Sequence, residues 1–249
     1  MIFKYAEIRR FLSYVKSLGS ISPLADWQFS SSNVTILRHD VDFDVEAAYR
    51  LALIEAELDV RSTYFFLTTC HTYNLLSSPN RLMIFEMARL GFEIGLHFDP
   101  TIYGDVSIDQ LKKFVDQEAL ILSLITGAPV RSVSLHNPSV HGQYPLFDGY
   151  CNAYDKRIFS DDCYLADSRM DFRGKNPYTF VERVKERPIQ ILLHPLHYSE
   201  DGLGYPSAVR KHIKNYLAVI DDTFRVNLTY QAQMSDTDLF PSLIGEESK

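Results

Sequence analysis

Residues 36–44 read ILRHDVDFD, an apolar run that ends in one histidine and three aspartates. Like charges packed this closely repel one another and are costly to remove from water. In an extended chain, residues two positions apart point to the same side, so Asp40 and Asp42 share one face. The stretch therefore predicts a buried strand whose end either faces open water or surrounds a neutralising group such as a metal ion.

Strand-like apolar runs alternate with helical patterns along the rest of the chain. The strand-like runs lie at 34–38, 62–69, 92–96, 130–135, 163–166, 189–193 and 224–230, with room for another within 151–160. Between them, apolar residues recur with the helical period, as they do from Val209 to Ile220. Such alternation predicts an α/β fold with a parallel sheet and right-handed crossovers. We expect a single, irregular (β/α) barrel of seven or eight strands, with an open doubly wound sheet as the alternative.

Composition narrows the class of protein. The chain has 249 residues, 46% of them hydrophobic, and a net charge of −7, which argues against nucleic acid or an anionic membrane as a partner. The three cysteines form no CxxC pair, and no apolar run is long enough for an integral membrane segment. We expect one domain over 1–240, a polar tail over 241–249 and a cytoplasmic location; the oligomeric state is left open.

Acids and histidines follow several of the strand-like runs. Both candidate folds place their chemistry at the carboxyl ends of the strands, where this chain puts Asp40, Asp42, His97, His136, Asp167 and His194. His71 is expected in a loop, and His141 and His212 on the surface. Carboxylate and imidazole ligands suit one divalent ion, Zn²⁺ first, with Mn²⁺, Fe²⁺, Co²⁺ or Ni²⁺ as alternatives. Three protein ligands would leave a position open for water, as catalytic sites require.

Three motifs in this order resemble the polysaccharide deacetylase family, the NodB-homology fold of carbohydrate esterase family four. LRHDVD stands where the family has a strand ending in Thr-Phe-Asp-Asp-Gly. GFEIGLH matches the family's second motif, and ILLHP matches its last. The resemblance spans residues 36 to 194 and implies a distorted (β/α) barrel that binds a divalent metal.

The resemblance also implies residue roles. Asp42 and His97 would be metal ligands, Asp40 the general base, and His194 the general acid that protonates the leaving amine. Val41 separates the two acids, so the reverse assignment of base and ligand between Asp40 and Asp42 stays open.

Two departures from the family pattern matter. The position of the family's second histidine ligand holds Thr101, and the Arg-x-Pro-Tyr motif is replaced by SLHNPS. We predict that His136 supplies the third ligand, with His194 and Asp99 as alternatives.

These residues predict a cytoplasmic, metal-dependent hydrolase that removes an N-acetyl group from a sugar. With RHDVD and EIGLH, the chain resembles divergent family members that are found in bacterial surface-polysaccharide (O-antigen) gene clusters. The resemblance implies a sugar substrate, and whether that sugar is free, nucleotide-linked or lipid-linked stays open. Tyr198 is expected to stack on the sugar, and Arg169 to bind a substrate carboxylate or phosphate or to orient Asp40. A non-catalytic sugar-binding protein on the same fold and a barrel metallo-phosphoesterase are the alternatives.

Overall fold

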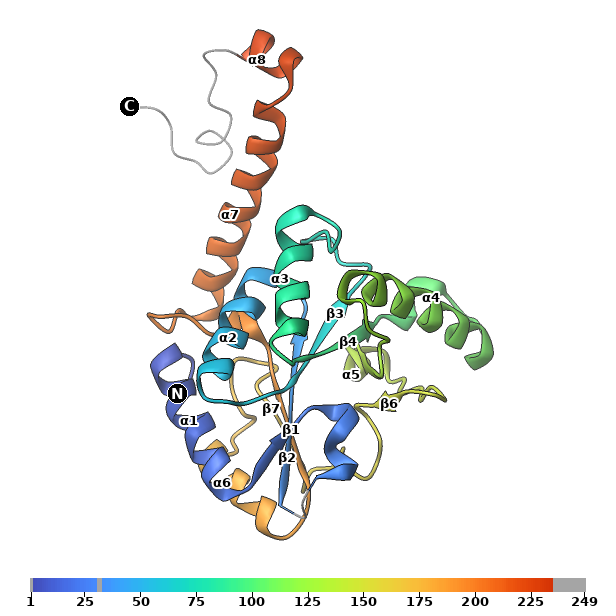
Figure 1. Ribbon diagram of the computed structural model, residues 1–249, viewed down its shortest axis with the longest axis vertical. Helices are drawn as coiled ribbons and strands as arrows, with labels where there is room; N and C mark the ends of the chain where they lie inside the picture. Colours follow the sequence, from blue (N-terminus) through green and yellow to red (C-terminus); the bar gives the residue numbers. More distant parts are fainter. Residues whose placement is uncertain (1, 31–32, 235–249) are drawn as a thin grey trace. The chain divides into compact units, whose positions relative to one another are not determined.

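The centre of the fold is a parallel sheet, seen in the computed structural model, which describes residues 2–30 and 33–234 (Figure 1). Seven strands pair in the order β6-β5-β4-β3-β2-β8-β7, and β1 pairs with the start of β2. Their bounds are β1 Ser20–Ser22, β2 Val34–Val41, β3 Thr63–Leu67, β4 Glu93–Phe98, β5 Ser132–Leu135, β6 Cys151–Asn152, β7 Tyr164–Ala166 and β8 Ile189–Leu193. The sheet curls into an open half-barrel, so the predicted irregular (β/α) barrel is confirmed.

Helices α1 to α4 contact the strands of this sheet (Figure 1). The α-helices are α1 Tyr5–Leu18, α2 Val45–Glu57, α3 Ser78–Arg89, α4 Ile108–Thr126, α5 Pro138–His141, α6 Pro177–Val181, α7 Tyr205–Arg225 and α8 Leu228–Met234. Short 3-10 helices are η1 Leu24–Phe29, η2 Pro100–Tyr103, η3 Glu182–Lys185 and η4 Pro195–His197. Asp44 caps α2 by accepting from the Ala47 amide, which places a helix start directly after the acidic stretch.

The strand predicted at 224–230 is wrong. α7 continues to Arg225, and α8 begins at Leu228. Asn227 lies between them, and its side-chain oxygen accepts from the amides of Thr229 and Tyr230. This capping contact starts a new helix. An alternation of apolar and polar residues over only seven positions is too short to exclude a helix.

Strand register decides which side chains fill the half-barrel. Arg38 lies opposite Thr63, Leu67 opposite His97, and His97 opposite Ser134. Since side chains alternate between faces, the same interior face carries Arg38, Asp40, Phe65, Gly95, His97, Ser134, Gln190 and Leu192. His39 points to the other face, where it stacks on Tyr64 at 4.3 Å and lies 2.7 Å from Glu55.

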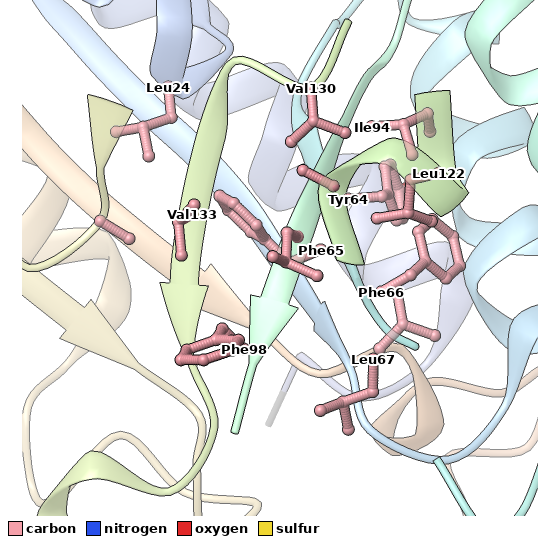
Figure 2. Packing of buried hydrophobic residues seen from close by; sticks show 14 of the residues in the cluster. Leu24, Tyr64, Phe65, Phe66, Leu67, Ile94, Phe98, Leu122, Val130 and Val133 are labelled. Atoms are coloured by element: carbon pink, nitrogen blue, oxygen red, sulfur yellow. The ribbon is translucent and has the colours of Figure 1, made fainter. Parts of the chain in front are cut away.

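Aromatic side chains pack against the strands from within and from outside the sheet (Figure 2). Phe65 occupies the space that a side chain at position 95 would need. A Cβ on Gly95 would lie 2.5 Å from the Phe65 ring, so this strand position accepts only glycine without repacking.

The amino-terminal end of the half-barrel is closed by η1. The Leu24 amide donates to Thr63 and the Ala25 amide donates to Glu93, at 2.7 and 3.0 Å. Glu93 also accepts from Thr63 and Ser132 at 2.6 Å each, so its buried carboxylate is fully engaged. Chemistry is thereby confined to the other end, where the strands finish.

Contacts divide the chain into two compact units, Met1–Gly202 and Leu203–Lys249. Every predicted site residue lies in the first unit. The predicted polar tail, 241–249, falls outside the described residues. Within the described ranges, no helix is both long and apolar enough to cross a membrane.

Candidate metal centre and catalytic residues

Three predicted ligands meet at the carboxyl ends of β2, β4 and β5. His97 Nε2 lies 3.1 Å from Asp42 Oδ1, and His136 Nδ1 lies 3.3 Å from both of these atoms. A tetrahedral ion with bonds of about 2.0–2.1 Å needs ligand atoms about 3.3–3.4 Å apart. The three donor atoms therefore have the spacing and the chemistry that Zn²⁺ requires, and the residues fit a divalent ion.

His136 reaches this position because the chain turns sharply after β5. Its amide donates to the Phe98 carbonyl, which extends the pairing of β5 with β4 by one residue. Asn137 then adopts a left-handed φ of 49°, and its side-chain Nδ2 lies 2.8 Å from His136 Nε2. Exchanging the amide oxygen and nitrogen by a 180° flip would let Oδ1 accept a proton from Nε2, which would leave Nδ1 without a proton and facing Asp42.

The alternative third ligands lie elsewhere. Asp99 is not part of the group of ligand atoms formed by Asp42, His97 and His136, and it accepts from the amide and hydroxyl of Thr101, at 2.9 and 2.5 Å. Thr101 itself is exposed in η2. His194 Nε2 faces the other oxygen of Asp42, at 3.8 Å, so it lies beside the three ligands and not among them.

Electrostatics favour an ionised Asp42. Burial would raise the pKa of its carboxyl, but hydrogen bonds with His136 and His97 and the nearby charge of His194 outweigh burial and hold that pKa well below its usual range. Asp42 is thus a carboxylate that needs positive charge around it, which is the electrostatic character of a cation site.

Asp40 is buried at the end of β2, among polar groups of the half-barrel interior. Arg38 Nη1 lies 3.2 Å from its Oδ1, and the Ser134 hydroxyl lies 3.2 and 3.3 Å from its two oxygens. Arg38 also donates to Ser134, and its guanidinium lies 5.0 Å from the ring centroid of Tyr154. A fully buried arginine is costly unless paired, so these contacts fix Arg38 and Asp40 together.

His194 forms a pair with Asp167, which follows β7. His194 Nδ1 lies 2.6 Å from Asp167 Oδ1, and the His194 amide also donates to that carboxylate. Burial would lower the pKa of the imidazole, but the charge and hydrogen bond of Asp167 raise it to about 9. His194 is therefore cationic at neutral pH, with Nε2 directed at Asp42.

Tyr198 does not take the predicted position. It is 3% exposed, packs against Phe3, and donates its hydroxyl to Asp167 at 2.9 Å. Its ring consequently offers no face to a sugar, because the polar tip of a buried tyrosine seeks a partner in the interior. Tyr198 supports Asp167 instead.

Arg169 lies exposed in the loop after Asp167. The arginine that contacts Asp40 is Arg38, so the expectation that Arg169 orients Asp40 is wrong, while its role in substrate binding stays a prediction. The sequence did hold a signal for Arg38. It stands two residues before Asp40 in an apolar run, on the same face, where an unpaired charge would be unfavourable.

Comparisons with known proteins give a likeness of fold. No protein-family model matches the chain, and no curated protein matches it. The solved structures that it resembles include deacetylases and esterases of carbohydrate esterase family four and a pseudoenzyme of that family.

Three of these structures illustrate the range of sequence identity, coverage and structural similarity. A chitin deacetylase from the fungal pathogen Colletotrichum lindemuthianum is 18% identical, with 75% of this chain and 83% of that one covered and a TM-score of 0.47. A peptidoglycan deacetylase from Bacillus subtilis is 15% identical, with 81% and 98% covered and a TM-score of 0.43. For a mutant of the Bacillus anthracis pseudoenzyme with restored activity, identity is 14%, coverage 76% and 64%, and the TM-score 0.44, so the chain spans less than two thirds of that protein.

Proposed function

We propose that this protein is a metal-dependent hydrolase that removes an acyl group, N-acetyl first, from a sugar used in surface-polysaccharide (O-antigen) synthesis. The observation that carries this proposal is the convergence of Asp42, His97 and His136 within 3.1–3.3 Å of one another. Asp40 and a cationic His194 flank this cluster, and a hydrolase needs such a base and acid on either side of the scissile bond.

Asp42, His97 and His136 would hold one divalent ion, Zn²⁺ first. When bound, such an ion polarises a carbonyl and lowers the pKa of water. Asp40 and His194 would then carry the proton transfers.

Asp40 is the proposed general base. Arg38 and Ser134 hold its carboxylate in one orientation, which keeps it ready to accept a proton from a water molecule at the mouth of the half-barrel. Because Arg38 also contacts Tyr154 and Tyr164, loss of either tyrosine hydroxyl should disturb Asp40 less than loss of Arg38 itself.

His194 is the proposed general acid. Its pairing with Asp167 keeps the imidazole protonated and fixes Nδ1, which leaves Nε2 to donate to the departing amine. Asp167 is itself held by the Tyr198 hydroxyl, so the acid is supported from the interior.

Sugar recognition would fall to exposed groups at the rim. Tyr144 is 41% exposed and packs edge-on against Tyr154 at 5.5 Å, so part of its ring is available for stacking on a pyranose. Arg169 would bind a carboxylate or phosphate of the substrate or of its carrier.

The test combines elemental analysis of the purified protein with an acetate-release screen on N-acetylated nucleotide sugars. We expect one divalent ion per chain and release of acetate that Asp40→Asn abolishes while the metal is retained. A protein that binds no divalent ion in any preparation would contradict the proposal and favour the non-catalytic sugar-binding alternative.

One observation favours the metallo-phosphoesterase as a second candidate. Asp167, His194 and His197 form a further group of ligand atoms close enough to bind a cation. Two ions per chain, with phosphate release and no acetate release, would establish this alternative over the deacetylase.

A further inference from the structure

The longest helix of the second unit carries an apolar stripe on its surface. In the 21 residues of α7 only Ala208 is buried, whereas Ile213, Ile220 and Phe224 are 51%, 38% and 56% exposed. Successive spacings of seven and four residues place these three on one side of a helix. Val209 begins the same line, and we call Val209, Ile213, Ile220 and Phe224 the α7 stripe.

The charges of α7 are divided unevenly between its two halves. The first half holds Arg210, Lys211 and Lys214 and no acid, whereas Asp221 and Asp222 lie near the end, where Arg225 in the last turn pairs with Asp221. Cations near a helix amino terminus are the unfavourable arrangement. A second helix that runs the other way would offset this, because its two aspartates would lie beside the basic half.

Arg210 and Asp221 are placed to make such a contact. They lie about three turns apart on the same flank of the α7 stripe. Asp221 is held there by Arg225 at 2.6 Å and by the Tyr230 hydroxyl at 2.9 Å. In an antiparallel pair the same flanks of two helices face each other, so Arg210 of each copy would approach the partner's Asp221.

We propose that α7 is a self-association surface through which two copies of this chain pair antiparallel, with the α7 stripes in contact. Each copy would bury Ile213, Ile220 and Phe224 against the other, and the two Arg210–Asp221 contacts would set the direction. A parallel pair would instead bring the basic halves together. An anionic lipid surface is disfavoured because Asp221 and Asp222 share the helix with the basic residues.

The first experiment measures the oligomeric state of the full chain by sedimentation equilibrium. We expect a dimer, and we expect the double variant Ile213→Asp/Ile220→Asp to raise the dissociation constant about tenfold or more. The control is Val219→Asp, which changes an equally apolar residue that is 60% exposed but lies about 100° around the helix from Ile220. Circular dichroism would verify that each variant keeps its helix content.

The second experiment tests the direction of pairing. Arg210→Glu should weaken the dimer several-fold, more at low salt, while Lys211→Glu should leave it unchanged. Both variants make the same change in charge, but Lys211 lies about half a turn away from Ile220 and so faces away from the stripe. A dimer tightened by Arg210→Glu would overturn the antiparallel arrangement.

Other outcomes would overturn the proposal as a whole. A wild-type chain that stays monomeric would assign the α7 stripe to another occupant, such as residues 235–249 of the same chain. Binding of the monomer to vesicles of anionic phospholipid would assign it to a membrane. Neither result depends on the metal centre, so the proposed hydrolase activity would stand or fall separately.

Discussion

Asp42 is the residue on which the candidate site depends, since its two oxygens serve different neighbours. Oδ1 faces His97 and His136, and Oδ2 faces His194. A single carboxylate thus joins the cation site to the proposed general acid. A charge change at any of these residues should be felt by the others, because partly buried charges at this distance are weakly screened.

His136→Ala should lower the affinity for Zn²⁺ at least about 100-fold, because the ring supplies one of three ligand atoms. Thr101→Ala should leave the affinity unchanged, since Thr101 contacts Asp99 outside the cluster. Competition with a chelating dye measures both constants. Equal affinity in His136→Ala and the parent would remove His136 from the ligand set.

His194→Gln should retain the metal and lose turnover by roughly 10²–10⁴-fold, the usual contribution of a general acid. The amide keeps a hydrogen bond to Asp167 but has no proton to transfer. Metal content and acetate release are measured on the same sample. Loss of the metal in this variant would make His194 a ligand and would end its assignment as the acid.

The stability of the metal-free protein should depend on pH through His194. Its folded pKa is raised from 6.5 to about 9, so the stabilisation it provides is present below pH 6.5 and disappears as pH rises through 9. Asp167 has a pKa below its usual range, where burial is outweighed by the charge and hydrogen bonds of His194 and His197, and its contribution stays constant over this interval.

Urea denaturation from about pH 6 to about pH 10 would measure that dependence. His194→Gln should flatten the curve, and His71→Gln, a change in an exposed loop, should not. A parallel pH dependence in parent and His194→Gln would show that another group titrates.

At the scale of elements, β3 and β4 pack closely because the Phe65 ring of β3 lies against Gly95 of β4. Gly95→Ala should destabilise the fold by about 1–3 kcal/mol, because the new methyl group would overlap the Phe65 ring. Phe65→Leu in the same chain should recover part of that loss, as coupled neighbours do. Gly204→Ala is the matched control, since its Cβ meets nothing within 4 Å. If the two substitutions change the free energy of unfolding additively, the proposed close packing of Gly95 against Phe65 is refuted.

Periodicity was a good guide to those elements that are buried on both faces. β2, β4 and β8 are apolar runs that lie at the expected positions. The alternation of side chains along β2 puts Arg38 and Asp40 on one face, and Asp42 follows directly after the strand. The run 224–230 failed because a cap at Asn227, and not apolar alternation, decides its structure. Arg38 and Tyr198 depend on partners more than 25 residues away in sequence, such as Ser134 for Arg38 and Asp167 for Tyr198, which local patterns do not specify.

At the scale of the whole molecule, one cation would tie three separate strands together. Binding to the native state alone adds RT ln(1 + [L]/Kd), about 2.7 kcal/mol at a ligand concentration of 100 times Kd. We expect Zn²⁺ to raise the melting temperature, and a chelator to lower it, in the parent but not in Asp42→Ala. Differential scanning calorimetry measures the shift. An equal shift in Asp42→Ala would place the stabilising ion elsewhere.

The strand order also has a consequence for how the chain is made. β2 pairs on one side with β3, which follows closely, and on the other with β8, which leaves the ribosome some 150 residues later (Thr35 pairs with Ile189). During synthesis the outer edge of β2 stays open, while β4 and β5 can already bring His97 and His136 to Asp42. A nascent chain would therefore bring together the candidate cation ligands before the proposed general acid. The last strand to emerge would both seal an aggregation-prone edge and supply the residue that makes the site competent.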